Sequence, residues 1–115
     1  MDIDAEDSGV LSLIGYNAQL NGPTDSERRR IIDGLFTGRI SIPKSLPTAY
    51  VAGWRQEISL IRLRKIALSI ASFTRQQKRK RNGSLQAVQK WESDLDYLKS
   101  RYYKPFASQF NWPST

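Results

Sequence analysis

The sequence predicts an all-α fold, a small bundle of three to four helices that ends in a long antiparallel helical hairpin. Three observations lead to this prediction. Apolar residues recur every three or four positions along two long stretches, residues that cap helices precede the expected helices, and a turn of two or three residues joins the two longest ones. The chain has 115 residues, of which 39% are hydrophobic, so it is long enough for one domain with its own core.

The first nine residues differ from the rest in charge. Residues 1–9 carry four acidic side chains, and we expect them to form a flexible tail that leaves residues 10–115 as a single helical domain. Secretory and mitochondrial leaders are basic, and no apolar stretch approaches the ~20 residues needed to span a bilayer. We therefore expect a cytoplasmic protein with no membrane partner. If the source is eukaryotic, a nuclear protein is expected, because the KRKR string at residues 78–81 suits an import signal.

Residues 25–37 are expected to form the first helix. Thr24 and Glu27 have the spacing of a capping box, in which both side chains accept hydrogen bonds from free backbone N–H groups at the helix start. Gly38 is expected to end the helix, because glycine adopts a positive φ at little cost. The apolar residues at helical spacing are Ile31, Ile32, Leu35 and Phe36.

Residues 39–47 are interpreted as an extended connector. Pro43 and Pro47 fall in this segment, and proline cannot donate a backbone hydrogen bond to a helix or a sheet. Thr48 is a residue type that caps helices. A short helix is therefore expected to follow it and to contain Trp54.

Two long helices are expected next, over residues 57–80 and 84–103. The first has an apolar face wider than that of an ordinary surface helix, which is typical of a central helix. Asn82 and Gly83 break the chain between the two helices, and Ser84 can cap the second. With so short a turn, the helices should pack antiparallel.

The aromatic side chains divide into core candidates and a C-terminal group. Trp54 and Trp91 fall on apolar helical faces and are expected to anchor the core. Residues 102–112 hold five of the 12 aromatic residues. This segment either folds back over the core, which hides side chains that promote aggregation, or offers a surface for docking or base stacking. We favour the first interpretation.

Positive charge is concentrated in one segment. Residues 55–81 carry nine Lys or Arg side chains and one Glu, a balance of +8 that exceeds the +7 of the whole chain. Five of these cations fall within residues 75–81, at the end of the first long helix. Such a cluster can neutralise several phosphates of a nucleic acid. Cations also stabilise a helix C-terminus and keep a surface solvated, which is the competing interpretation.

We expect the cations of the central segment to contact phosphates, and three consecutive arginines of the first helix to add a second basic patch. The central residues are Arg62, Lys65, Arg75, Lys78, Arg79, Lys80 and Arg81. The auxiliary residues are Arg28, Arg29 and Arg30. An equally good interpretation of the auxiliary group is a surface pair of Arg29 or Arg30 with Asp33, which lies three or four positions away.

The residue types exclude several classes of enzyme. The chain has no Cys and no His, which removes thiol nucleophiles, Cys/His zinc sites and an imidazole base. Glu92, Asp94 and Asp96 are clustered acids, but consecutive members lie about 200° apart around a helix. Pairing of Asp94 with Lys90 and of Asp96 with Lys99 explains them better than a metal site. We expect no catalytic residue, no cofactor and no bound metal.

The sequence thus predicts a non-enzymatic nucleic-acid-binding domain, in which a basic helix and the turn after it contact phosphates. No helix-turn-helix with a recognition helix is evident, so binding is expected to be largely independent of sequence, with DNA and RNA both open. The alternative is a protein-interaction module, such as an adaptor, an inhibitor or an accessory subunit, whose basic cluster meets an acidic protein.

Overall fold

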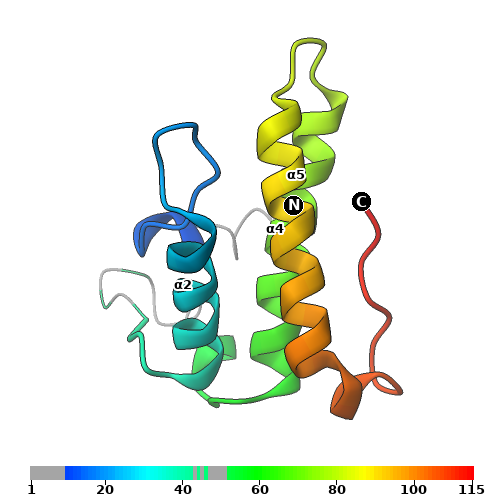
Figure 1. Cartoon of the computed structure of the whole chain (residues 1–115). Helices are drawn as coiled ribbons and strands as arrows, with labels where there is room; N and C mark the ends of the chain where they lie inside the picture. The colour runs from blue at the N-terminus through cyan, green and yellow to red at the C-terminus, as the bar shows by residue number, and fades with distance from the viewer. Residues whose placement is uncertain (1–9, 43, 45, 47–51) are drawn as a thin grey trace.

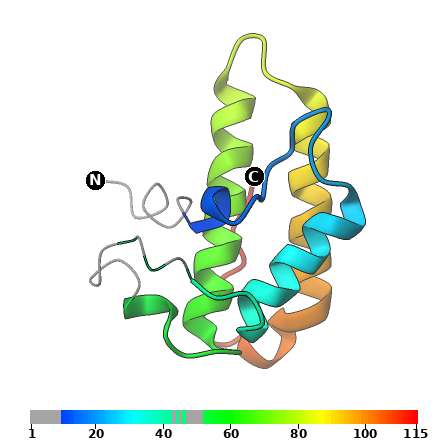
Figure 2. The same ribbon diagram turned by 90° about the vertical axis from the view of Figure 1, so that its left-hand side faces the viewer.

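The computed structural model describes residues 10–42, 44, 46 and 52–115, and these residues form helices and connecting segments but no strand (Figure 1). The longest helices are α2 (Asp25–Thr37), α4 (Leu60–Arg79) and α5 (Leu85–Leu98). Shorter helical turns are η1 (Ala52–Trp54), η2 (Lys99–Tyr103) and η3 (Lys104–Phe106). Figure 2 shows α4 and α5 side by side as a hairpin, with α2 lying across it. The prediction of an all-α bundle with a C-terminal hairpin is confirmed.

Helix α2 begins and ends where the sequence predicted. Thr24 Oγ1 accepts a hydrogen bond from the backbone N–H of Glu27 at 3.2 Å, and Glu27 Oε1 accepts one from the N–H of Thr24 at 3.1 Å. The capping box is therefore complete. At the other end Gly38 has φ 85°, and a Cβ there would lie 2.3 Å from the Glu57 side chain. The positive φ favours glycine at this position, whereas the exposed Glu57 side chain can move to make room for a Cβ.

The two hairpin helices are shorter than the periodicity predicted. Helix α4 begins at Leu60 rather than residue 57, because the Ser59 side chain caps it by accepting from the N–H of Arg62. Helix α5 has Ser84 as its N-cap, as predicted, but its regular turns end at Leu98. The π-helical turn η2 then covers residues that were expected to continue the α-helix.

The C-terminal segment folds back along the hairpin, as the favoured interpretation predicted (Figure 1). Its aromatic residues form a cluster that packs against the core. The Tyr103 ring centroid lies 5.2 Å from that of Phe110 and 4.9 Å from that of Trp112. The Tyr103 hydroxyl also donates to the carbonyl oxygen of Phe110 at 2.5 Å, which fixes the chain reversal.

One hydrophobic cluster joins α2, α4 and α5. Trp54 is fully buried in it, as expected of a core anchor. Trp91 is partly buried, and its ring lies 5.6 Å from that of Phe73. The short helix expected around Trp54 is the 3-10 turn η1, and its expected cap Thr48 lies outside the described residues, as does the tail of residues 1–9. Within the described ranges, no helix combines the length and the apolar character that crossing a bilayer requires.

Candidate nucleic-acid interface

Three cations lie where the hairpin reverses, and we call them the basic turn: Arg79, Lys80 and Arg81. The turn connects α4 to α5 and forms the tip of the hairpin (Figure 1). All three side chains are exposed. Within the part of the chain that the structure describes, none of the three forms a hydrogen bond or an ion pair through its side chain. Their charges are therefore available to a ligand.

The backbone of the turn is tightly constrained. Helix α4 ends at Arg79, and the N–H of Lys80 donates to the carbonyl oxygen of Gln77 at 3.2 Å. Gly83 passes close to the same carbonyl, and a Cβ on Gly83 would lie 2.2 Å from the oxygen. Helix α5 begins two residues later, so the positive end of its dipole adds to the potential beside the cations.

Arg75 and Lys78 extend the basic turn along α4, but both also contact other parts of the protein. Arg75 Nη1 donates to the carbonyl oxygen of Ser114 at 3.1 Å, and Lys78 Nζ to that of Thr115 at 2.8 Å. Lys78 Nζ also pairs with Glu92 Oε1 at 2.8 Å. The hydrogen bond from Lys78 holds the pKa of Glu92 below its ordinary value. Glu92 is thus ionised at neutral pH and offsets part of the positive charge.

Lys65 lies apart from the basic turn. It is 14 positions before Arg79 in the same helix, or about 21 Å at 1.5 Å per residue. Its ammonium nitrogen lies 5.9 Å from the centroid of the Trp54 ring, which is a cation–π contact at the opposite end of the hairpin. The structure therefore does not bring Lys65 together with the predicted cluster.

Arg62 is buried, contrary to its expected place on the surface. Only 5% of it is exposed, and its guanidinium donates from Nη1 to the carbonyl oxygen of Leu35 at 2.7 Å and from Nη2 to that of Trp54. Burial lowers the pKa of Arg62, against the opposing effect of Glu57. The side chain ties α4 to the end of α2 and to η1, so it is not free to contact phosphates.

Arg28 is also buried, so it does not belong to a surface patch. Its Nε donates to Asp94 Oδ2 at 2.8 Å, and its Nη1 donates to the carbonyl oxygen of Pro23 at 3.1 Å. Its Nη2 pairs with Asp25. The hydroxyl of Tyr16 donates to the same Asp94 oxygen at 2.6 Å. Arg28 therefore holds three segments of the fold together.

Of the remaining auxiliary arginines, Arg30 is exposed and Arg29 is half-buried over an aromatic ring. The guanidinium carbon of Arg29 lies 5.0 Å from the Tyr97 ring centroid. Asp33, their expected partner, instead accepts from the Tyr97 hydroxyl at 2.5 Å and pairs with Arg101 at 3.4 Å. No ion pair of Asp33 with Arg29 or Arg30 is present among the described residues.

Asp94 in α5 has another partner than predicted, and no ion pair of Asp96 with Lys99 is present among the described residues. Asp94 pairs with Arg28 instead of Lys90, and Lys90 Nζ donates to the carbonyl oxygen of Gln19 at 3.1 Å. The sequence-based pairing of Asp94 with Lys90 is therefore wrong. The signal for the observed pair was present, because Asp94 shares a helical face with Leu98 and the buried Ala87.

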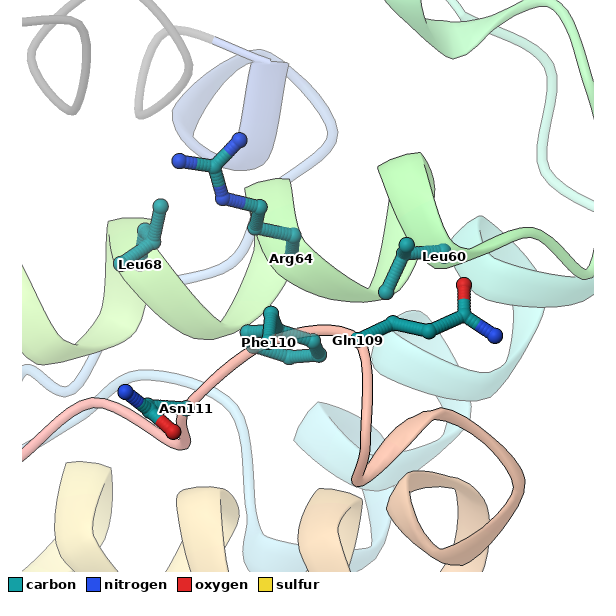
Figure 3. A pocket seen from close by; sticks show the side chains of 6 residues that line it. All are labelled: Leu60, Arg64, Leu68, Gln109, Phe110 and Asn111. Atoms are coloured by element: carbon teal, nitrogen blue, oxygen red, sulfur yellow. The ribbon is translucent and has the colours of Figure 1, made fainter.

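An exposed cation also borders a cavity at the other end of α4. This cavity of about 420 Å³ lies between the helix and the returning C-terminal segment (Figure 3). The Phe110 ring faces α4 there, whereas the Arg64 side chain extends from the helix in the direction away from Phe110. The cavity is lined by Leu60, Arg64, Leu68, Gln109, Phe110 and Asn111. It thus has one charged lining residue, which does not converge with other polar groups.

Of the predicted contact residues, the structure leaves Arg79, Lys80 and Arg81 exposed together, places Arg75 and Lys78 beside them, and separates or buries the others. Comparisons of the chain with protein-family models, curated proteins and solved structures found no match.

Proposed function

We propose that this protein is a non-enzymatic nucleic-acid-binding domain that acts in the cytoplasm, or in the nucleus if its source is eukaryotic. The observation that carries the proposal is the basic turn, whose three exposed cations have no side-chain partner among the described residues. Structural cations usually pair with a carboxylate or cap carbonyl groups, as Arg28 and Arg62 do here. The cations of the basic turn have neither role.

The proposed mechanism is neutralisation of backbone phosphates. Each phosphate that Arg79, Lys80 or Arg81 contacts releases condensed counterions, which makes binding strong at low salt and tolerant of sequence. Lys78 directly precedes the basic turn in the sequence, and Arg75 adds positive charge about one turn of helix before Arg79. Phosphate contacts position a nucleic acid but do not read its bases, so the basic turn alone would favour no particular sequence.

The test is to remove the three charges together. The variant Arg79→Ala/Lys80→Ala/Arg81→Ala should lose at least ~10-fold in affinity for a random DNA or RNA probe at ~150 mM salt. Its log–log salt slope should fall by about 2 to 3, because the slope changes by about 0.9 per phosphate. Fluorescence anisotropy at several salt concentrations measures both quantities.

A matched control removes the same charge elsewhere. Arg39, Arg55 and Lys104 are exposed and belong to segments at the other end of the bundle. Their triple alanine variant should keep most of the affinity. If the two triple variants bind equally well, the cations act only through net charge, and the proposed interface is wrong.

A second candidate function is docking to an acidic protein. Leu20 and Leu85 are 75% and 70% exposed, and Leu85 lies four residues after Arg81. Exposed apolar side chains beside cations are suited to a protein interface. The Leu85→Ser variant separates the two functions, because it should leave affinity for nucleic acid unchanged. A nuclease-resistant complex that is lost in Leu85→Ser would favour the protein partner.

A further inference from the structure

A second feature lies directly beside the basic turn: a cavity of about 480 Å³. It is formed by the loop before α2, the end of α4 with the turn, and the start of α5. Figure 2 shows this loop beside the start of α5, at the same end of the molecule as the turn. Lys80 belongs to the basic turn and also lines the cavity, so one ligand can contact both features at once.

The lining of this cavity suits a flat, polar, aromatic ligand. Gln19, Gln77 and Gln86 are among the residues that line it, and within the described residues their side-chain amides form no hydrogen bond. An amide offers both a donor and an acceptor, which is the combination found on the edge of a nucleobase. The volume lies within the ~300–1,000 Å³ typical of small-ligand sites.

Trp91 supplies the second part of the argument. It lines the same cavity, and its indole Nε1 is a buried donor with no partner among the described residues. Such a donor has a free-energy cost unless a ligand accepts its hydrogen bond. Leu20 lies at the same cavity and is 75% exposed, so a bound ring would bury apolar surface there as well.

We propose that the cavity holds the base of an unpaired nucleotide whose phosphates contact the basic turn. This inference rests on the proposed function and adds a ligand class to it. A base within a duplex has its edge paired and its faces stacked, so it cannot enter the cavity without leaving the helix. The protein should therefore prefer single strands, loops and bulges over an uninterrupted duplex.

The first experiment compares a single strand with a duplex of the same length. We use unstructured 12-nucleotide DNA and RNA strands and the corresponding duplexes, and the full chain. The parent protein should bind the single strands at least ~10-fold more tightly at the same salt concentration. The variant Gln77→Leu/Gln86→Leu keeps the side-chain volume but removes the amides. It should lose about 5-fold for single strands and less than about 2-fold for duplexes.

The matched control is Gln76→Leu/Gln89→Leu, on the same two helices but outside the cavity lining. It should bind both probes as the parent does. Circular dichroism and thermal melting of each variant establish that it is folded. Equal binding of single strand and duplex by the parent, or equal behaviour of the two glutamine variants, overturns the cavity assignment but leaves the proposed function intact. If the parent binds neither probe, the proposed function fails, and the cavity assignment fails with it.

A second measurement does not depend on the glutamines. The three indole N–H signals of the ¹⁵N-labelled protein can be followed by NMR while a nucleoside monophosphate is added, and the Trp91→Phe variant identifies the signal of Trp91. This signal should shift on addition, whereas that of the fully buried Trp54 should stay in place. An unchanged Trp91 signal at saturating nucleotide overturns the assignment.

Discussion

Arg28 and Asp94 form an ion pair whose two side chains are both completely buried, with 2.8 Å between Nε and Oδ2. Burial raises the pKa of Asp94, against the opposing effect of its hydrogen bonds from Arg28 and Tyr16. Tyr16 in turn has its pKa raised, by burial and by the neighbouring carboxylate. The pair therefore links the segment before α2, α2 itself and α5 through one buried polar network.

Removing one partner of this pair should be strongly destabilising. Asp94→Ala leaves the Arg28 guanidinium buried without its carboxylate, and we expect a loss of about 3–5 kcal/mol in the free energy of unfolding. The double variant Arg28→Met/Asp94→Leu should recover most of it. Urea denaturation measures the difference. The control Asp96→Ala, at an exposed position of the same helix, should stay within ~0.5 kcal/mol of the parent. Equal stability of the two alanine variants would refute the structural role.

A variant of Arg62 can distinguish a structural role of this side chain from a role in binding nucleic acid. Arg62→Met removes hydrogen bonds to the carbonyl oxygens of Leu35 and Trp54. We expect a loss of about 2–4 kcal/mol in stability, because both acceptors are left in a buried site. At a temperature where the variant is folded, its affinity for nucleic acid should match that of the parent, unlike that of Arg79→Ala. If Arg62→Met lost as much affinity for nucleic acid as Arg79→Ala, Arg62 would belong to the interface.

The helices could be predicted from the sequence because local patterns determine them. The capping box at Thr24 and the apolar periodicity of α4 depend on residues a few positions apart. The burial of Arg28 and Arg62 depends on contacts with segments far away in the chain, such as Asp94 and Leu35. Charge counts treat every cation as equal, and only packing distinguishes a cation that joins two helices from one that faces solvent.

The sequence nevertheless carried a signal for Arg28. It lies four and seven positions before Ile32 and Leu35, which places all three on the buried face of α2. A charge on an apolar face predicts a buried partner. The cavity beside the basic turn had no such signal, because its lining comes from three segments whose proximity depends on the packing of α2 against the hairpin.

Ile58 carries a local backbone strain that can be relieved. Its φ is 48°, which is unfavourable for a β-branched residue, while its N–H donates to the carbonyl oxygen of Phe36 at 2.9 Å. The side chain is 62% exposed, so little packing is lost on substitution. Ile58→Asn should stabilise the protein by about 1 kcal/mol, because asparagine tolerates this conformation. Ile61→Asn, also at an exposed isoleucine but within α4, should not raise the melting temperature. A higher melting temperature in both variants would show that replacing an exposed apolar side chain by a polar one stabilises the protein, and that relief of strain does not.

Alkaline pH should unfold the protein through its tyrosines. Burial, together with the hydrogen bond to Asp33, raises the pKa of Tyr97 from 10.0 to about 12. The folded state therefore keeps a proton that the unfolded state loses, so this contribution to stability is complete below pH 10 and is lost as the pH rises towards 12. Urea midpoints measured between pH 9 and 11.5 should fall less steeply for Tyr97→Phe than for the parent. Parallel curves would show that Tyr97 does not contribute.

Glu92 should weaken the affinity of the basic surface for a polyanion, because it pairs with Lys78 at 2.8 Å. Its lowered pKa keeps this pair intact at neutral pH. In Glu92→Gln, Lys78 is released from its ion pair and can contact one more phosphate. The affinity for a nucleic acid should therefore rise about 2- to 3-fold at low salt, and the salt slope should steepen by up to ~0.9. Asp96→Asn makes the same change in net charge one turn along α5, and subtracting its effect isolates the contribution of the pair. If the two variants raise affinity equally at every salt concentration, Lys78 is not part of the interface, and the surface that contacts phosphates is confined to the basic turn.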